Sequence, residues 1–324
     1  MSDLKRKART CRIAKATGVA GSKKHLLTLL TNLDKNKYQV HILPRRITRQ
    51  TMYVCITLHA ERLHSDRLWG RLAEFVKFLD TQAIKATFFS IAPLHLVYRG
   101  QPGFSEEKWV RRLSYLHHKE HLIEQHTHFY GEREKKGDLS YHNLRKRLEE
   151  DKHWLEQHGF PIQGFVGGAW VINKDVFQLL IDNGYKYDCT ARSFEFGYLQ
   201  GRGDQLIASE SFKVLSGSNS LLEMPTTASV QNMLLGFLPF VSYKPYLVGE
   251  EDIRFCIVYL HDYDLVKITV RNALKLGIHW LKARGGQFIT TRELHPILDA
   301  VQLEERSLGG LADGFVRISP ANCR

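Results

Sequence analysis

The sequence contains few cysteines and no long apolar run, and both shortages exclude classes of protein. Its 324 residues include five cysteines, an odd number, spread along the chain without a C-x-x-C pair. This usage disfavours a disulfide framework and a thiolate metal site, and it favours a reducing compartment. The leucine-rich stretch from Leu26 to Leu30 is too short for a secretory signal or for the roughly 20 residues of a membrane helix. We therefore expect a globular, cytoplasmic protein without a transmembrane segment.

Beyond the first fifty residues the chain carries almost no net charge, although its formal charge is +12. Residues 1–51 hold thirteen lysines and arginines against two acidic residues, whereas the remaining 273 residues hold 33 basic and 32 acidic side chains. A nucleic-acid groove on the folded domain needs a basic face, which this balance does not require, so we expect no nucleic-acid partner. One alternative stays open, in which the basic arm is an electrostatic tether to nucleic acid or anionic lipid.

The N-terminal segment suggests a domain boundary near residue 51. Within residues 10–43, a strand-like start is followed by a glycine loop, a helix-like stretch and a second strand-like stretch. This pattern resembles the opening unit of nucleotide-sugar glycosyltransferases with two Rossmann domains. So short a segment cannot bury a core or hold a donor. We expect a glycosyltransferase-like remnant over residues 1–51, a functional domain over 52–300 and a C-terminal tail over 301–324.

From Met52 onward, short β-rich runs alternate with amphipathic helix-like stretches. The expected strands cover residues 53–58, 85–91, 121–125, 162–166, 187–190, 221–224, 255–260 and 287–290. The expected helices cover residues 67–80, 106–118, 144–158, 174–183 and 266–283, with a last helix opened by a capping box from Thr290 to Glu293; Asp66 and Asn173 are expected N-caps. This alternation predicts an α/β fold with a parallel sheet, and seven or eight repeats favour a barrel over an open sheet.

Polar residues gather where three of the expected strands end. His59 and Glu61 share one face of the first strand end because successive residues point to opposite faces, and the same holds for His126 and His128. The seventh strand ends at His261. Taken singly, a histidine at a strand end is more often structural, but a barrel of parallel strands gathers its chemistry at these ends. One carboxylate and two imidazoles there predict an open three-ligand site for zinc or a similar divalent ion.

The order of the motifs adds a resemblance to a known family. The motifs are KATFF (85–89), HLIEQHTH (121–128), GFVGGAW (164–170), NGYKYD (183–188) and VYLHD (258–262). Over residues 52–298 the chain resembles the polysaccharide deacetylase family, the NodB-homology domain of family-four carbohydrate esterases. The resemblance implies a distorted (β/α)7 TIM-like barrel that binds a divalent metal and hydrolyses the N-acetyl group of an amino sugar.

The resemblance implies roles for the first two strand ends. The family's base aspartate falls on His59, and its carboxylate ligand falls on Glu61. The family's two histidines, four residues apart, correspond to His126 and Tyr130, so His128 between them is the substitute ligand. We expect Glu61, His126 and His128 to hold a divalent ion, zinc before cobalt, nickel or manganese.

The resemblance also assigns the general acid and the substrate contacts. His261 matches the family's general acid, with Asp262 or Asp264 to orient it. The glycine turn that contains Gly168 is expected to hold the oxyanion through a backbone N–H, and Trp170 is expected to line a sugar pocket. Val166 stands where the family has an arginine that steadies its base aspartate.

These assignments predict a carbohydrate N-deacetylase, a metal-dependent hydrolase that removes an acyl group, N-acetyl first, from an amino sugar or glycan precursor. The loss of the base aspartate together with its arginine fits either a rewired site with a histidine base or a decayed one. The alternative is a catalytically inactive deacetylase-like barrel that binds a glycan or a partner protein.

Overall fold

The computed structural model describes residues 50–95, 99, 103–129, 139–194, 205–230, 246–248, 251–311 and 316–318. The glycosyltransferase-like pattern lies outside these ranges, as does Tyr130, and the boundary near residue 51 stays a prediction. Within the described part of the chain, none of the helices combines the length and the apolar character needed to span a membrane.

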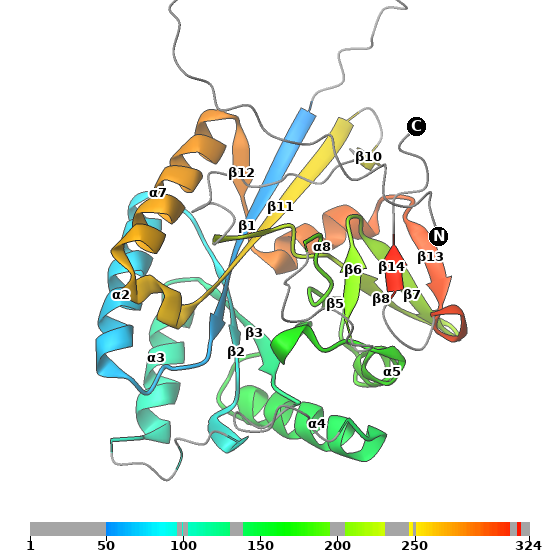
Figure 1. Cartoon of the computed structure of the whole chain (residues 1–324), viewed down its shortest axis with the longest axis horizontal. Helices are drawn as coiled ribbons and strands as arrows, with labels where there is room; N and C mark the ends of the chain where they lie inside the picture. Colours follow the sequence, from blue (N-terminus) through cyan, green and yellow to red (C-terminus); the bar gives the residue numbers. More distant parts are fainter. Residues whose placement is uncertain are drawn as a thin grey trace, which may run out of the picture. The chain divides into compact units, whose positions relative to one another are not determined.

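Seven parallel strands form the centre of the described fold (Figure 1). In spatial order they are β11 (Glu251–His261), β1 (Gln50–Ala60), β2 (Thr87–Ser90), β3 (Leu122–Thr127), β4 (Gly164–Gly167), β5 (Tyr187–Asp188) and β8 (Asn219–Glu223). Each corresponds to a strand expected from the sequence, and the eighth expected strand is β12 (Gly286–Phe288), which pairs with β1. The α/β fold with a mostly parallel sheet is therefore confirmed.

The expected helices are present around these strands (Figure 1). They are α2 (Asp66–Thr81), α3 (Glu106–His118), α4 (Tyr141–Gln157), α5 (Lys174–Asp182), α7 (Ile268–Ala283) and α8 (Thr291–Asp299). Each packs one apolar stripe inward; on α2 the stripe consists of Leu72, Phe75, Val76 and Leu79.

The helix caps follow the sequence with one exception. Asn173 caps α5 through its side chain, and Thr290 forms the expected capping box with Glu293 at the start of α8. The prediction for α2 was wrong by one residue. Ser65 is the N-cap and accepts a hydrogen bond from the Leu68 amide, whereas Asp66 lies in the first turn, where its charge favours the helix dipole.

Several short elements were not expected from the sequence. They are the strands β6 (Leu206–Ala208), β7 (Phe212–Ser216), β9 (Ala228–Ser229), β10 (Tyr246–Val248), β13 (Glu304–Ser307) and β14 (Val316–Ile318), and the 3₁₀ turns η1 (Pro93–His95), η3 (Gly168–Trp170), η5 (Asp262–Val266) and η6 (Leu308–Gly310). Because β13 pairs with β7 and β14 with β6, part of the expected C-terminal tail contributes strands to the described sheets.

Strand β1 shows how the fold positions the candidate site. Val54, Ile56 and Leu58 belong to the large apolar cluster that includes the buried faces of the helices, whereas Cys55 belongs to a second cluster between the strands. A strand covered on both faces is apolar almost throughout. His59 follows Cys55 by four residues and therefore points to the same inner face, at the carboxyl end of the strand.

Candidate active site

The carboxyl ends of β1, β3 and β11 bring the expected site residues together. His59 on β1 lies opposite His261 on β11 in the parallel register, although 202 positions separate them in the sequence. His126 comes from the end of β3, which pairs with β4 rather than with β1. Glu61 follows β1 directly. The barrel therefore gathers residues from three distant segments at one end.

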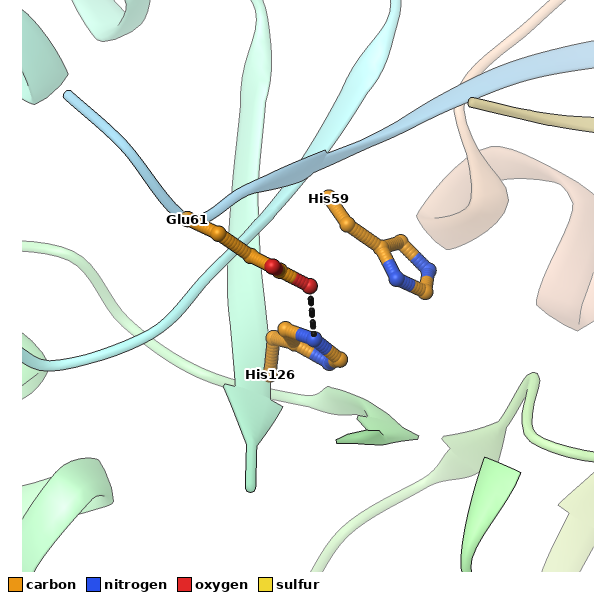
Figure 2. Close-up of side chains that lie close together, drawn as sticks. All are labelled: His59, Glu61 and His126. Carbon is orange, nitrogen blue, oxygen red and sulfur yellow. Dashed lines mark hydrogen bonds and ion pairs between the residues drawn. The ribbon is translucent and has the colours of Figure 1, made fainter. Parts of the chain in front are cut away.

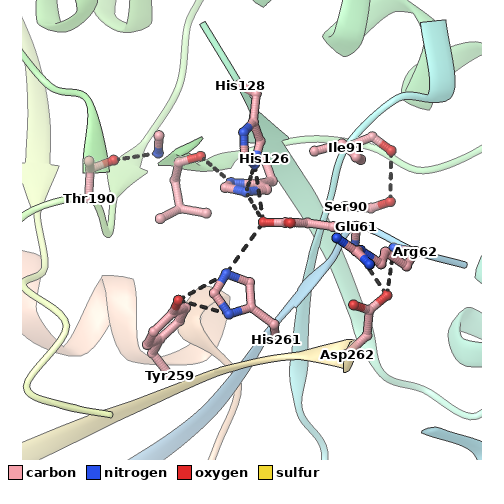
Figure 3. A network of polar contacts seen from close by, with 12 residues as sticks. Glu61, Arg62, Ser90, Ile91, His126, His128, Thr190, Tyr259, His261 and Asp262 are labelled. Carbon is pink, nitrogen blue, oxygen red and sulfur yellow. Dashed lines mark hydrogen bonds and ion pairs between the residues drawn. The ribbon is translucent and has the colours of Figure 1, made fainter. Parts of the chain in front are cut away.

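The carboxylate of Glu61 is the centre of the cluster (Figures 2 and 3). Its Oε1 lies 3.1 Å from Nε2 of His126, 3.1 Å from Nε2 of His128 and 3.5 Å from Nε2 of His261. Burial raises the pKa of Glu61, but the charge of His128 and the polar contacts with His126 and His128 outweigh it, so this pKa lies well below its usual value. Glu61 is therefore a carboxylate at neutral pH.

The backbone of β4 sets the tautomer of His126. Nδ1 of this ring lies 2.9 Å from the carbonyl oxygen of Val166, which can only accept, so Nδ1 carries the proton. Nε2 then presents a lone pair toward Glu61 and toward Nε2 of His128, 3.0 Å away. Burial is the main cause that lowers the pKa of His126, which keeps the ring neutral. A ligand histidine in a metalloprotein is held in this way.

Converging lone pairs at this point fit a cation. Nε2 of His126, Nε2 of His128 and Oε1 of Glu61 are 3.0 to 3.1 Å apart. A divalent ion about 2.1 Å from each atom fits such a triangle and leaves its opposite side open for substrate. Among the described residues, His59, Glu61 and His126 also meet the spacing of a metal-binding group. The structure therefore contains a candidate His/Glu metal site. Its four possible ligand side chains are those of His59, Glu61, His126 and His128.

His59, the residue predicted to be the base, lies against two other histidines of the cluster. Its ring centroid is 4.3 Å from that of His126 and 5.4 Å from that of His261. Burial first, and then the neighbouring His126 and His261, lower the pKa of His59 well below its usual value. The ring is therefore neutral at neutral pH and can accept a proton.

The geometry decides between the two aspartates offered as partners of His261. Asp264 accepts a hydrogen bond from the His261 amide at 3.0 Å and lies 3.3 Å from Nδ1 of its ring. Asp262 instead accepts from the amides of Glu61 and Arg62, at 3.1 and 2.7 Å. We expected Asp262 to act with His261. In the structure Asp262 instead holds the backbone that carries Glu61, and Asp264 is the aspartate that contacts the imidazole of His261.

The aspartates also differ in charge. Burial raises the pKa of Asp262 to about 7, whereas hydrogen bonds from His261 overcome burial at Asp264 and lower its pKa. Asp264 therefore stays ionised beside the imidazole and can accept a hydrogen bond from Nδ1 of His261.

The glycine turn after β4 forms one wall of the site. Ala169 and Trp170 have left-handed backbone angles, with φ of 52° and 60°, an uncommon conformation for residues other than glycine and often associated with function. Trp170 lines the cavity as expected. Gly168 is not among the lining residues: a Cβ at this position would lie 2.6 Å from the His128 ring, so Gly168 faces His128.

A cavity of about 180 Å³ opens onto the cluster. Its lining combines polar side chains with glycine, alanine and aromatic residues: His59, Glu61, His128, Gly167, Ala169, Trp170, Tyr259, His261 and Tyr263. Aromatic faces beside convergent polar groups are typical of a site for a small organic substrate, sugars included.

Two aromatic residues of this cavity were missed from the sequence. The hydroxyl of Tyr259 lies 2.9 Å from Nε2 of His261, and Tyr263 stacks on the same ring with centroids 4.3 Å apart. Tyr259 precedes His261 by two residues, so strand periodicity alone places both on one face. The position of Tyr263 depends on the 3₁₀ turn η5, and no periodic pattern in the sequence predicts it.

Comparisons with known proteins identify the fold. No protein-family model matches the sequence, and a search of curated proteins gave no match. A protein from Mycobacterium smegmatis described as a polysaccharide deacetylase has a TM-score of 0.53 at 14% identity, over 79% of this chain and 93% of its own. PuuE allantoinase has a TM-score of 0.50 at 12% identity, over 78% and 91% of the two chains. A 4-alpha-glucanotransferase from Thermococcus litoralis has 0.50 at 10% identity, over 82% of this chain and 42% of its own.

At these identities the similarity shows the fold and no more. The chain has the distorted, mostly parallel barrel of these structures, one of which is described as a polysaccharide deacetylase, as the sequence resemblance implied.

Proposed function

We propose that the protein is a metal-dependent hydrolase that removes an acyl group, N-acetyl in the first instance, from an amino sugar or glycan precursor. The observation that carries the proposal is the set of lone pairs from Glu61, His126 and His128, which converge 3.0 to 3.1 Å apart at the mouth of a deacetylase-like barrel. One carboxylate and two imidazole nitrogens gathered this closely are a ligand set that suits a divalent cation such as zinc.

The side chains around the ligands supply the remaining chemistry. A divalent ion, zinc before cobalt, nickel or manganese, would polarise the acyl oxygen and activate a water molecule. His59, neutral because of its burial, accepts the proton of the attacking water. His261, oriented by Asp264, donates a proton to the leaving amine. Ala169 lines the cavity, and its backbone amide would donate to the oxyanion, whereas the Gly167 amide already donates to Thr190.

The cavity supports a sugar as the substrate. Trp170 and Tyr259 lie with centroids 4.8 Å apart at 72°, and Tyr263, which also lines the cavity, stacks on the ring of His261. Aromatic faces suit the apolar faces of a sugar ring, while the polar side of the cavity receives its acylated nitrogen.

The alternative is an inactive barrel that binds a glycan or a partner protein. It is favoured by Val166, which is 1% exposed within the apolar cluster between the strands. The position of the family's arginine is therefore filled by a packed side chain, and His59 has no guanidinium partner there.

Metal analysis and one pair of variants distinguish the two functions. The enzyme should contain about one divalent ion per chain and hydrolyse a member of a panel of N-acetylated sugars. His59→Ala should lose roughly 10²-fold in kcat and still retain metal, because His59 acts as the base. His59→Asp should also weaken a rewired site, whereas it should create activity in a decayed one. Bound metal without hydrolysis of any panel member, in wild type and in His59→Asp, would leave the binding protein as the better explanation.

A further inference from the structure

One peptide group connects the candidate metal site to a buried carboxylate. Its carbonyl, from Val166, accepts the Nδ1 proton of His126 at 2.9 Å, and its N–H, from Gly167, donates to Oγ1 of Thr190 at 2.7 Å (Figure 3). The Thr190 hydroxyl in turn donates to Oδ1 of Asp188 at 2.6 Å. Four consecutive groups thus form a single chain of hydrogen bonds that ends at a ligand histidine.

The chain runs through the interior. Thr190 and Asp188 are both 0% exposed, and Gly167 is buried. Hydrogen bonds in such surroundings are electrostatically stronger than in water, and successive bonds polarise one another. A Gly167 amide that donates to Thr190 makes the Val166 carbonyl a better acceptor for His126.

Asp188 is held as the charged end of this chain. It lies opposite Glu223 in the parallel register of β5 and β8, and both carboxyls are fully buried. Burial raises the pKa of Glu223 well above its usual range and that of Asp188 to about 6. Glu223 is therefore the member that keeps a proton, and Asp188 orients the Thr190 hydroxyl away from Gly167. The Thr190 oxygen can then accept the hydrogen bond from the Gly167 amide.

The same turn positions the second ligand histidine. Gly168 follows the clamped peptide, and its Cα faces the ring and backbone of His128 so closely that a Cβ would lie within 2.8 Å of both. A shift of the turn would therefore move His128 as well as release His126.

We propose that Thr190 and Asp188 are positioning residues of the metal centre, acting through the Val166–Gly167 peptide to hold the Nε2 lone pair of His126 toward the metal. The inference rests on the proposed metal-dependent function. Thr190 lies outside the two strand ends that carry the ligands, and its hydroxyl contacts Asp188 and the Gly167 amide. Residues that orient ligand histidines in this way commonly change metal affinity 10- to 100-fold when they are replaced.

The test compares three variants of the full chain, with zinc as the probe. Thr190→Val removes the hydroxyl at nearly constant shape, Thr190→Ser keeps it, and Thr226→Val is the matched control. Thr226 is 2% exposed and its hydroxyl donates to the Cys189 carbonyl at 3.0 Å. Thr226→Val therefore removes an equally buried hydroxyl from the neighbouring loop. Zinc affinity is measured by competition with a chromophoric chelator, and the tautomer of His126 by ¹⁵N NMR of the zinc-free protein.

Thr190→Val should weaken zinc binding about tenfold and reduce the population with a proton on Nδ1, while Thr190→Ser and Thr226→Val stay within about twofold of wild type. Equal zinc affinity in Thr190→Val and wild type, or an equal loss in Thr226→Val, overturns the proposal. If Thr190→Val does not fold, Asp188→Asn carries the same test because it weakens the acceptor that orients the hydroxyl; unchanged zinc affinity there also overturns the proposal.

The two readouts separate this proposal from the proposed function. A wild-type protein that binds none of zinc, cobalt, nickel and manganese refutes the metal-dependent hydrolase. The NMR comparison then still tests the hydrogen-bond chain, since it uses zinc-free protein: an unchanged His126 tautomer in Thr190→Val counts against it.

Discussion

Replacing Gly168 by alanine should displace a metal ligand with a single methyl group. The added Cβ would lie 2.6 Å from two ring atoms of His128 and 2.8 Å from its Cα. Carbon atoms in contact are normally about 3.5 to 4.0 Å apart, so His128 or the turn must move by about 1 Å. Because Cα is part of the backbone, a rotation of the imidazole alone does not remove the overlap.

The size of this overlap sets the expected losses of stability and of zinc affinity. Overpacking of this kind costs about 1 to 3 kcal/mol of stability, which for a domain of this size lowers the thermal midpoint by about 2 to 12 °C. Metal–ligand distances tolerate deviations of only about 0.2 Å. A displacement of about 1 Å should therefore weaken zinc binding at least tenfold, through a residue that offers no ligand atom.

The assay pairs a chelator competition for zinc with a thermal melt of the zinc-free protein. Gly70→Ala is the control, since a Cβ at this exposed position of α2 meets no atom within 4 Å and alanine favours a helix. The control should bind zinc as wild type does and be equally stable or more so. If Gly168→Ala also binds zinc with wild-type affinity, either His128 is not a ligand or the turn does not hold it.

Two further predictions concern the ligands and a buried acid. Glu61→Ala and His126→Ala should each lose metal during gel filtration, whereas the exposed His142 should be replaceable by alanine without effect; full occupancy in either ligand variant would refute the site. Burial raises the pKa of Asp151 to about 8, against about 3.9 in an unfolded chain. The folded protein therefore loses stability as the pH rises from about 4 to about 8, and Asp151→Asn should gain thermal midpoint relative to wild type over that interval. Parallel curves for the two proteins would show that Asp151 does not titrate in this way.

The sequence alone determined the main repeating elements. Apolar runs of β-branched residues marked the central strands, and the spacing of Leu72, Phe75, Val76 and Leu79 marked α2, because these patterns depend on local geometry. Strands as short as β6, β9 and β14 have too few residues for a period to show, and their pairing depends on distant partners. The N-cap of α2 shows the same limit, since Ser65 and Asp66 are both good caps.

Strand periodicity also determined which site residues share a face, such as His126 with His128, because that relation lies within a few residues. The tertiary structure decided the rest. The choice of Asp264 over Asp262 depends on the η5 turn, and the link from Thr190 to His126 depends on the pairing of β3, β4 and β5. Sequence patterns report local geometry, whereas these contacts join segments that only the folded sheet brings within hydrogen-bond distance.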